Sequence, residues 1–347
     1  MNPRIALPLY TVLAFSASMA IAGLYFAAED TWPNILLAGF LLAGLGLGGA
    51  FVVAMHDASG GRWLGPMRRI ACGMTRLVLP GSIIALVAIT IGGGELYPAF
   101  HEHLDGFKGW WLGRTFFTAR AFAYVAAWMV SLSFLRRGRG AVAYLVIFSI
   151  TVSGATFDWI MSLDPHWVST ILAIYHFSGM VTAALAVIAI VAVKQSRHDE
   201  RITSDHIHDV AKLFFAFSTF WMYIWFSQAM LVWYTNIPEE ATFYTLRAYG
   251  NWGVLFWAVV VIRWVLPFLA LLSEKTKRNR TILRRVAIAA LIGHWLDLYV
   301  SIVAASHAEP VLTGWELAVA FGTFAAIGWA VTRVEAPAVL APVIART

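Results

Sequence analysis

Long apolar runs separated by short polar stretches occupy most of the sequence. A helix of about 20 apolar residues crosses the roughly 30 Å hydrocarbon core of a membrane. About ten runs reach this length, near residues 7–27, 35–55, 77–94, 114–135, 141–161, 170–193, 212–233, 252–272, 286–305 and 314–332. The pattern therefore predicts an all-α integral membrane protein with about ten transmembrane helices.

The first run allows two interpretations. It carries one Arg, an apolar core and small residues near Ala20, as secretory signal peptides do. The run continues to Ala27, however, and cleavage would leave nine helices. We therefore expect a retained transmembrane helix.

The positive charge of the chain follows the predicted topology. A net charge of +6 suggests nucleic acid as a partner, but 20 of the 25 Lys and Arg residues fall on alternate loops and at the chain ends. Such loops face the cytoplasm by the positive-inside rule. We expect a multi-pass protein of the bacterial inner membrane with both termini in the cytoplasm.

Four charged residues lie inside the apolar runs, where each costs on the order of 3 kcal/mol unless it is paired or hydrated. Asp297 and Arg263 each lie about 11 residues into their runs, which predicts that the two meet near the midplane. Arg120 and Asp158 lie at a comparable level nearer the outer side. We expect two Arg–Asp pairs.

The two pairs suggest an internal repeat. Their spacings are similar, and the stretches ELYP and WYTNIPEE end the helix before each Arg-bearing helix. An even-numbered repeat keeps its orientation in the membrane. We expect four-helix bundles at residues 35–165 and 166–306, with single helices at 1–34 and 307–347.

The candidate proton-path or ligand residues have structural alternatives. Arg120 and Asp158 would only fix helix packing, or Arg120 would extend to the interface. His294 and Asp297 share a helix face at mid-depth, which favours a proton or substrate path, and Tyr299 follows them. His176 could ligate a haem together with His294, but it is expected well above His294, which argues against haem.

Other motifs favour structural roles. HEHLDG (101–106) and SDHIHD (204–209) lack a metal-ligand spacing, and the second predicts a helix start capped by Ser204 or Asp205. The glycines of GLGLGGAF (44–51) predict close helix packing. Cys72, expected in a basic loop, is the only cysteine, so we expect no metal site and no redox centre in this chain.

Aromatic residues gather near the predicted outer boundary, which is typical of an interface belt and also suits a docking surface for a partner protein. They include Trp110, Trp111, Trp159, Trp167, Trp233, Tyr234 and Trp252.

Several stretches are similar to a known family. They are TFDWIMSLDPHWVSTI (156–171), LFFAFSTFWMYIWFSQAMLVWYTNIPEE (213–240), KTKRN (275–279) and HWLDLY (294–299). They resemble the ActF-type membrane subunit of bacterial alternative complex III, a quinol:electron-acceptor oxidoreductase of the electron transport chain. The wider superfamily is that of NrfD/polysulfide-reductase-like membrane proteins.

The resemblance implies ten helices with two four-helix bundles, and a multisubunit respiratory complex. Its partners would be a paralogous membrane subunit, a multihaem cytochrome c subunit, an iron–sulfur subunit and a terminal oxidase. Haem and iron–sulfur clusters would lie in those partners. This chain would hold no covalent cofactor, and quinol or quinone would be its ligand.

The leading hypothesis is a subunit that contributes a proton path, a quinol contact or both. His294 and Asp297 would act at mid-depth, Asp158, Asp164 and His166 would complete the outer half, and Arg120 and Arg263 would keep the carboxylates ionised. A structural platform is the first alternative. A secondary transporter is the second, and it is less favoured because Pro267 has no counterpart in the first repeat.

Overall fold

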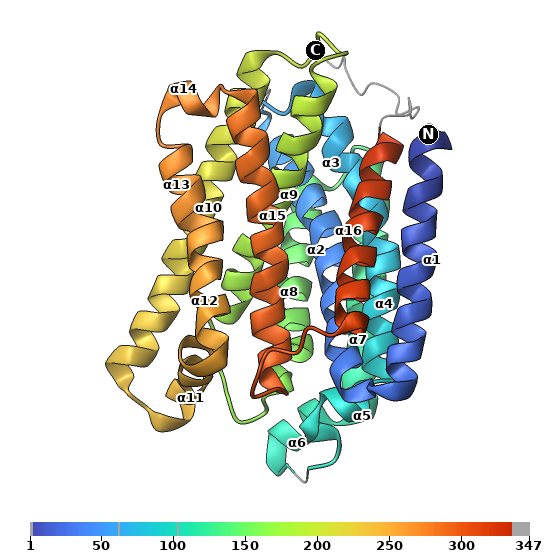
Figure 1. Cartoon of the computed structure of the whole chain (residues 1–347), viewed down its shortest axis with the longest axis vertical. Coiled ribbons are helices and arrows are strands. Elements are labelled where there is room, and N and C mark those ends of the chain that lie inside the picture. Colours follow the sequence, from blue (N-terminus) through green and yellow to red (C-terminus); the bar gives the residue numbers. More distant parts are fainter. Residues whose placement is uncertain (1–2, 62, 103, 335–347) are drawn as a thin grey trace.

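The computed structural model describes residues 3–61, 63–102 and 104–334, and these form a bundle of helices (Figure 1). Ten helical segments are long and apolar enough to cross a membrane. The prediction of an all-α, multi-pass membrane protein is confirmed.

Seven of the ten spans have one long α-helix, although the α8 span continues into a 3-10 turn (η4, Met161–Leu163), and one span is interrupted. The single helices are α1 (Pro3–Phe26), α2 (Ala28–Ser59), α7 (Arg114–Arg136), α8 (Ala141–Trp159), α9 (Leu172–Gln195), α10 (Ser204–Thr235) and α16 (Gly314–Val334). The interrupted span runs through α12 (Gly253–Val260), a π-helical turn (η6, Val261–Val265) and α13 (Leu266–Ala270). The two remaining spans end in or contain 3-10 turns: α3 (Arg68–Met74) with α4 (Val78–Thr90), and α15 (Arg280–Ile302) with η7 (Val303–Ala305).

Short helices lie between the spans. They are α5 (Gly93–Leu96), α6 (Gly106–Leu112), α11 (Pro238–Ala248) and α14 (Glu274–Lys277). Because α11 returns from the end of α10 toward α12, it covers one end of the second half of the bundle (Figure 1).

The spans pack in two groups that meet at α2 and α9. Helix α2 packs against α4 and α8, and α7 packs against α4 and α8. Helix α9 packs against α10 and α15, and α12 packs against α15. The pair α1 and α16 packs together along one edge, against α2 (Figure 1).

Glycines bring α2 into backbone contact with its neighbours. A Cβ on Gly39 would lie 2.4 Å from the Ala85 backbone nitrogen, and one on Gly81 would lie 2.3 Å from that of Ala43. A Cβ on Gly48 would lie 2.8 Å from the Met180 carbonyl oxygen of α9. The prediction that the glycines of residues 44–51 permit close helix packing is confirmed.

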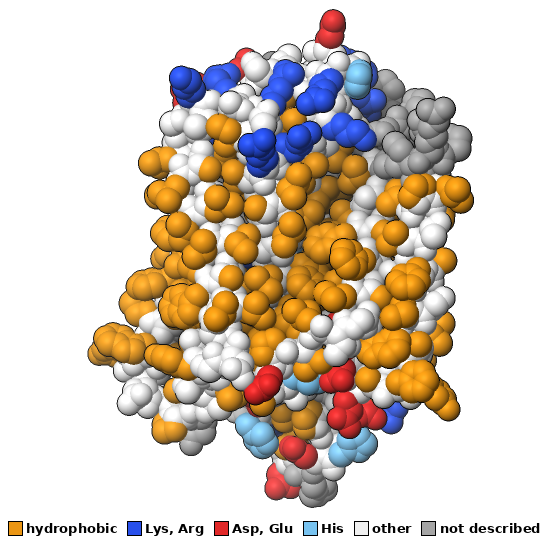
Figure 2. Space-filling model, viewed as in Figure 1, with side chains coloured by type: hydrophobic (Ala, Val, Ile, Leu, Met, Phe, Trp, Pro, Cys, Tyr) orange, Lys and Arg blue, Asp and Glu red, His pale blue; other side chains and the backbone are white. Residues whose placement is uncertain are grey.

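Charge is segregated between the two ends of the bundle. On the face shown in Figure 2, Lys and Arg side chains gather at one end, here called the basic end, and Asp, Glu and His side chains gather at the far end. Some acids, such as Asp57 and Asp199, pair with arginines at the basic end. The N-terminal end of α1 and the C-terminal end of α16 both lie at the basic end (Figure 1). Hydrogen bonds from Arg201 lower the pKa of Asp199, at the basic end, to about 2.

Three local expectations are corrected. The third span begins at Gly65 and ends at Thr90, and Cys72 lies within α3 instead of a loop. Helix α10 does begin at Ser204, but its cap is Thr203, whose hydroxyl accepts from the His206 backbone N–H at 3.4 Å. The His206 ring accepts in return from the Thr203 N–H, so both free donors are satisfied.

We expect Gly81→Val to destabilise the bundle. The added side chain must separate α2 from α4 at a backbone contact, and overpacking a close-packed core costs roughly 1–3 kcal/mol. The measurement is thermal denaturation of the detergent-purified protein. Ile83→Val on the same helix, whose side chain is exposed, is the matched control and should leave the transition unchanged. Equal transitions for Gly81→Val and the wild type would contradict this account.

Candidate functional site

The first Arg–Asp pair is fully bonded. Arg120 Nε donates to Asp158 Oδ2 at 2.8 Å and its Nη2 donates to Oδ1 at 2.9 Å. The Tyr124 hydroxyl donates to Oδ2 at 2.8 Å and Trp111 Nε1 donates to Oδ1 at 3.1 Å. The remaining guanidinium nitrogen donates to the Trp111 carbonyl oxygen at 2.8 Å. The predicted pair is confirmed.

This pair is closed as well as buried. Arg120 and Asp158 are 9% and 1% exposed, so Arg120 does not extend to the interface. Each carboxylate oxygen already accepts two hydrogen bonds, and the guanidinium lies 4.0 Å from the Trp111 ring centroid. The arrangement fits a structural ion pair.

The second pair brings α9, α15 and the π-helical turn together. Arg263 Nη1 and the Tyr175 hydroxyl both donate to the Asp297 carboxylate, to different oxygens. Arg263 Nη2 donates to the Gly179 carbonyl oxygen at 3.4 Å, and the guanidinium lies 4.3 Å from the Trp221 ring centroid. Arg263 Nε is buried without a partner. The predicted contact is confirmed, and it leaves bonding capacity unfilled.

The helix around Arg263 is interrupted for a local reason. Pro267 has no N–H, so the Arg263 carbonyl oxygen, four residues earlier, loses its α-helical donor. The Ser218 hydroxyl of α10 replaces that donor at 2.6 Å. The π-helical turn at Val261–Val265 places Arg263 at its centre, and such turns are frequent at functional sites.

Two glycines leave space for the Arg263 side chain. A Cβ on Gly293 of α15 would lie 2.8 Å from Arg263 Cγ. A Cβ on Gly179 of α9 would lie 3.2 Å from His294 Cε1 and 3.3 Å from Arg263 Nη2. A side chain at either position would press on the Arg263 side chain. Both neighbouring helices therefore carry a glycine where Arg263 packs against them.

Asp297 lies nearer the far end of its helix than the basic end. Helix α15 begins at Arg280, before the apolar run, so Asp297 is closer to the end of its span than to its start. Its partner Tyr175 lies in the first turn of α9, which begins at the far end at Leu172. Because Arg263, which contacts Asp297, lies nearer the basic end of its own span, Gly250–Ala270, the midplane position of the pair stays a prediction.

The two deep histidines are also closer in depth than expected. His294 lies beside Gly179, which follows His176 by three residues, or about 4.5 Å along α9. Both nitrogens of His176 and Nδ1 of His294 are buried without a hydrogen-bond partner. His176 packs edge-on against Phe40 and Tyr175. The expectation that His176 lies well above His294 is wrong.

A narrow cavity opens beside Asp297. The spaces between atoms there total about 380 Å³, part of it open to solvent, and leave room for about one water molecule. Residues of α9, α10, α11, α12 and α15 line it. The polar lining groups are Tyr175, Gln228, Tyr244, Arg247, Asp297 and Ser301, and the aromatic ones include Trp225, Phe243 and Phe256. Asp297 thus faces polar groups across an internal space instead of lipid.

A second cavity continues toward the far end. The spaces between atoms there total about 260 Å³, part of it open to solvent, and Asp164 is one of the lining residues. Leu172, Phe243, Arg247 and Ser301 line both cavities. The two spaces therefore adjoin, with Arg247 between Asp297 and Asp164.

The other predicted site residues lie elsewhere. The His166 side chain is exposed and its Nε2 lies 3.5 Å from Glu102. Asp158 lines neither of these two cavities. The His166 backbone N–H donates to Asp164 Oδ1 at 3.1 Å, but Asp164 is the one member of the predicted group of Asp158, Asp164 and His166 that lines either of these cavities.

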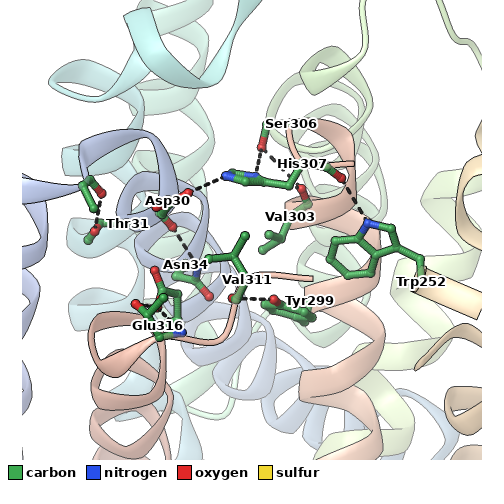
Figure 3. Close-up of polar contacts among 12 residues, drawn as sticks. Asp30, Thr31, Asn34, Trp252, Tyr299, Val303, Ser306, His307, Val311 and Glu316 are labelled. Atoms are coloured by element: carbon green, nitrogen blue, oxygen red, sulfur yellow. Dashed lines mark hydrogen bonds and ion pairs between the residues drawn. The ribbon is translucent and has the colours of Figure 1, made fainter. Parts of the chain in front are cut away.

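Tyr299 anchors a loop beside the site. Its hydroxyl donates to the Val311 carbonyl oxygen at 2.6 Å (Figure 3). In the same view His307 joins Asp30 of α2 at 2.8 Å, and Trp252 donates to the His307 carbonyl oxygen at 3.0 Å. These contacts hold the loop between α15 and α16 against both halves of the bundle.

The predicted aromatic surface is only partly exposed. Trp110, Trp233 and Tyr234 are more than half exposed, whereas Trp159, Trp167 and Trp252 are buried. The buried ones pack within the bundle, so they belong neither to an interface belt nor to a docking surface. Only the exposed three remain for those roles.

Metal ligands do not cluster in the part of the chain that is described: no three or more His, Cys, Asp or Glu side chains are placed to hold an ion. Of the HEHLDG stretch, His103 lies outside the described residues, and His101 contacts the Gly94 carbonyl oxygen at 3.1 Å.

No protein-family model and no curated protein matches the sequence.

Sequence reasoning did not find Tyr175, Gln228, Tyr244 and Arg247 of the cavity. Three of them lie in segments that read as ordinary apolar helix or polar loop. Gln228, a polar residue within the apolar run 212–233, is the one that carried a signal.

We expect Asp158→Ala to destabilise the fold strongly. It leaves the Arg120 guanidinium buried without its counter-ion, which costs roughly 3–5 kcal/mol when one partner of a buried pair is removed. The double variant Arg120→Met/Asp158→Leu, which removes both charges, should recover most of the loss. Thermal denaturation of the purified proteins checks both. A double variant no more stable than Asp158→Ala would contradict the ion-pair explanation.

Proposed function

We propose that this chain is an integral membrane subunit of a respiratory quinol:electron-acceptor oxidoreductase and contributes a proton path to it. The observation that carries the proposal is Asp297, an acid held by Arg263 and Tyr175 at the inner end of two adjoining cavities. The subunit class comes from the resemblance to the ActF-type subunit of alternative complex III.

The chemistry of the site supports proton transfer. An acid inside a membrane protein carries a proton if it alternates between the anion and the neutral acid. Arg263 and the Tyr175 hydroxyl stabilise the anion of Asp297, while burial favours the neutral acid. Polar groups along the first cavity, Gln228 and Ser301 among them, provide hydrogen-bond partners for water.

The route runs from the interior to the far end. His294, with a free Nδ1, lies beside Arg263 next to Gly179, one turn of α9 further inward than His176. Asp297 follows, then the first cavity, Arg247, and the second cavity with Asp164. We propose that the far end faces the outside of the bacterial inner membrane, because the basic end is the cytoplasmic side by the positive-inside rule.

A quinol contact is the second role for the first cavity. Trp225, Phe243 and Phe256 form aromatic walls, and Asp297 is a hydrogen-bonding base. These are the features a quinol head requires. A bound quinone that contacts none of these four residues in a structure of the assembly would remove this role and leave the proton path.

The proposed partners give a first prediction. If the chain belongs to such a complex, affinity purification of this subunit from native membranes should bring with it c-type haem, an iron–sulfur protein and a related membrane subunit. Reduced-minus-oxidised absorption spectra and mass spectrometry measure this. Purification of the intact chain without haem and with no quinol oxidation activity would contradict membership.

The proton path gives a second prediction, that Asp297→Asn abolishes proton release coupled to quinol oxidation while the complex still assembles. Asn has the size of the neutral acid and its oxygen still accepts from Arg263 or Tyr175, but it cannot release a proton. Proton release by the complex in liposomes is the measurement. Asp105→Asn, an exposed carboxylate near the far end, is the control and should behave as wild type. Unchanged proton release by Asp297→Asn rules out the role.

A further inference from the structure

Arg247 lies where the two cavities adjoin, between Asp297 and the far end. It lines both cavities, whereas Asp297 lines only the first and Asp164 only the second. Of the residues that line both cavities, Arg247 is the one that carries a charge, so it lies on the wall that the two spaces share. Arg247 is 3% exposed.

The guanidinium is held by backbone oxygens. Nε donates to the Val300 carbonyl oxygen at 3.1 Å, Nη2 to that of Ser301 at 3.3 Å, and Nη1 to that of Phe243 at 3.2 Å. Val300 and Ser301 lie in the last turn of α15, where the helix dipole favours a cation. These contacts fix the position of the charge without a carboxylate.

Aromatic stacking fixes it further. The guanidinium lies 3.7 Å from the Phe243 ring centroid, and that ring stacks on Trp167 with centroids 3.9 Å apart. Within the described chain, no ion pair joins Arg247 to an acid. Burial lowers the pKa of its guanidinium to about 10, so the group stays charged at neutral pH. The charge is therefore immobile, and the attraction of Asp164 across the second cavity, which acts to raise the Arg247 pKa, offsets it only in part.

We propose that Arg247 is an electrostatic gate that keeps protons and metal cations of the outer face from flowing back to Asp297. This inference rests on the proposed proton path. A fixed positive charge in a narrow space of low dielectric raises the energy of any cation beside it, while neutral water is unaffected. A proton leaving Asp297 for water crosses only when the redox reaction drives it.

The test is passive proton leak through the purified complex in liposomes, without quinol. A potassium gradient with valinomycin sets the membrane potential, and an internal pH dye reports proton entry. Arg247→Gln should raise the leak at least about tenfold because it removes the charge. Arg247→Lys, which keeps a cation at this position, should stay near the wild-type leak.

Arg114→Gln is the matched control. Arg114 also donates to a carbonyl oxygen at a helix end, that of Thr90 at 3.3 Å, and also lies over a Phe ring, Phe100 at 5.9 Å. Arg114 lines neither of the two cavities. The leak of this variant should equal that of the wild type, and an equal rise in both Gln variants would contradict the gate.

A double variant links the leak to the proposed route. Arg247→Gln/Asp297→Asn should return to the wild-type leak, because the open gate then leads to no proton carrier. A leak that persists in the double variant contradicts the proposal, since the protons would bypass Asp297. If Arg247→Gln leaks no more protons than the wild type, the gate is contradicted and the proposed function is not. If the single variant Asp297→Asn keeps full proton release coupled to quinol oxidation, the proposed function is contradicted.

Phe243→Leu covers the case in which Arg247→Gln does not assemble. It removes the ring beneath the guanidinium and keeps the charge, so the cation gains freedom to move. The proton leak of Phe243→Leu should exceed that of the wild type but stay below the rise of at least about tenfold expected when the charge is removed. Wild-type tightness in an assembled Phe243→Leu complex, together with an unstable Arg247→Gln, would assign Arg247 a structural role and overturn the gate.

Discussion

A buried charge in a membrane must find its counter-charge and its hydrogen bonds inside the protein, because hydrocarbon offers neither. Both Arg–Asp pairs satisfy this constraint, but in different ways. Asp158 is saturated by Arg120, Tyr124 and Trp111. Asp297 is held by fewer donors and borders a cavity. The same two residue types therefore serve a closed contact in one half and an open one in the other.

This contrast explains why the resemblance between the two halves does not extend to their chemistry. In the first half, Trp111 from the short α6 donates to the carboxylate and closes the pair. In the second, α11 instead carries Arg247, which bonds the end of α15 and leaves a space above Asp297. The short helices between the spans thus determine whether a pair is sealed.

The sequence predicts the fold well because long apolar runs admit few alternatives in a membrane. It also predicts both ion pairs, since charges at matched depth on neighbouring helices must meet. The depth of a residue along its helix is harder to predict from the sequence. Asn279 caps α15 ahead of the apolar run, and the arginines of its first turns extend the helix beyond that run, so the apolar run alone does not give the helix ends.

The cavity could not be predicted from the sequence, because five helices distant along the chain form it. No local pattern marks Tyr175 or Tyr244 as lining residues. Arg247 reads as a solvated loop charge, yet α11 folds back and buries it against the carbonyl oxygens of α15. Side chains that act across distant segments become visible only in the assembled bundle.

The π-helical turn at Val261–Val265 has a consequence for comparing this chain with distant relatives. One extra residue in a turn rotates the following part of the helix by about 100° relative to a regular α-helix. A relative that lacks one residue here would turn α13, with Pro267, toward a different neighbour. Alignments that treat this span as gap-free would then pair residues whose directions differ by about 100°.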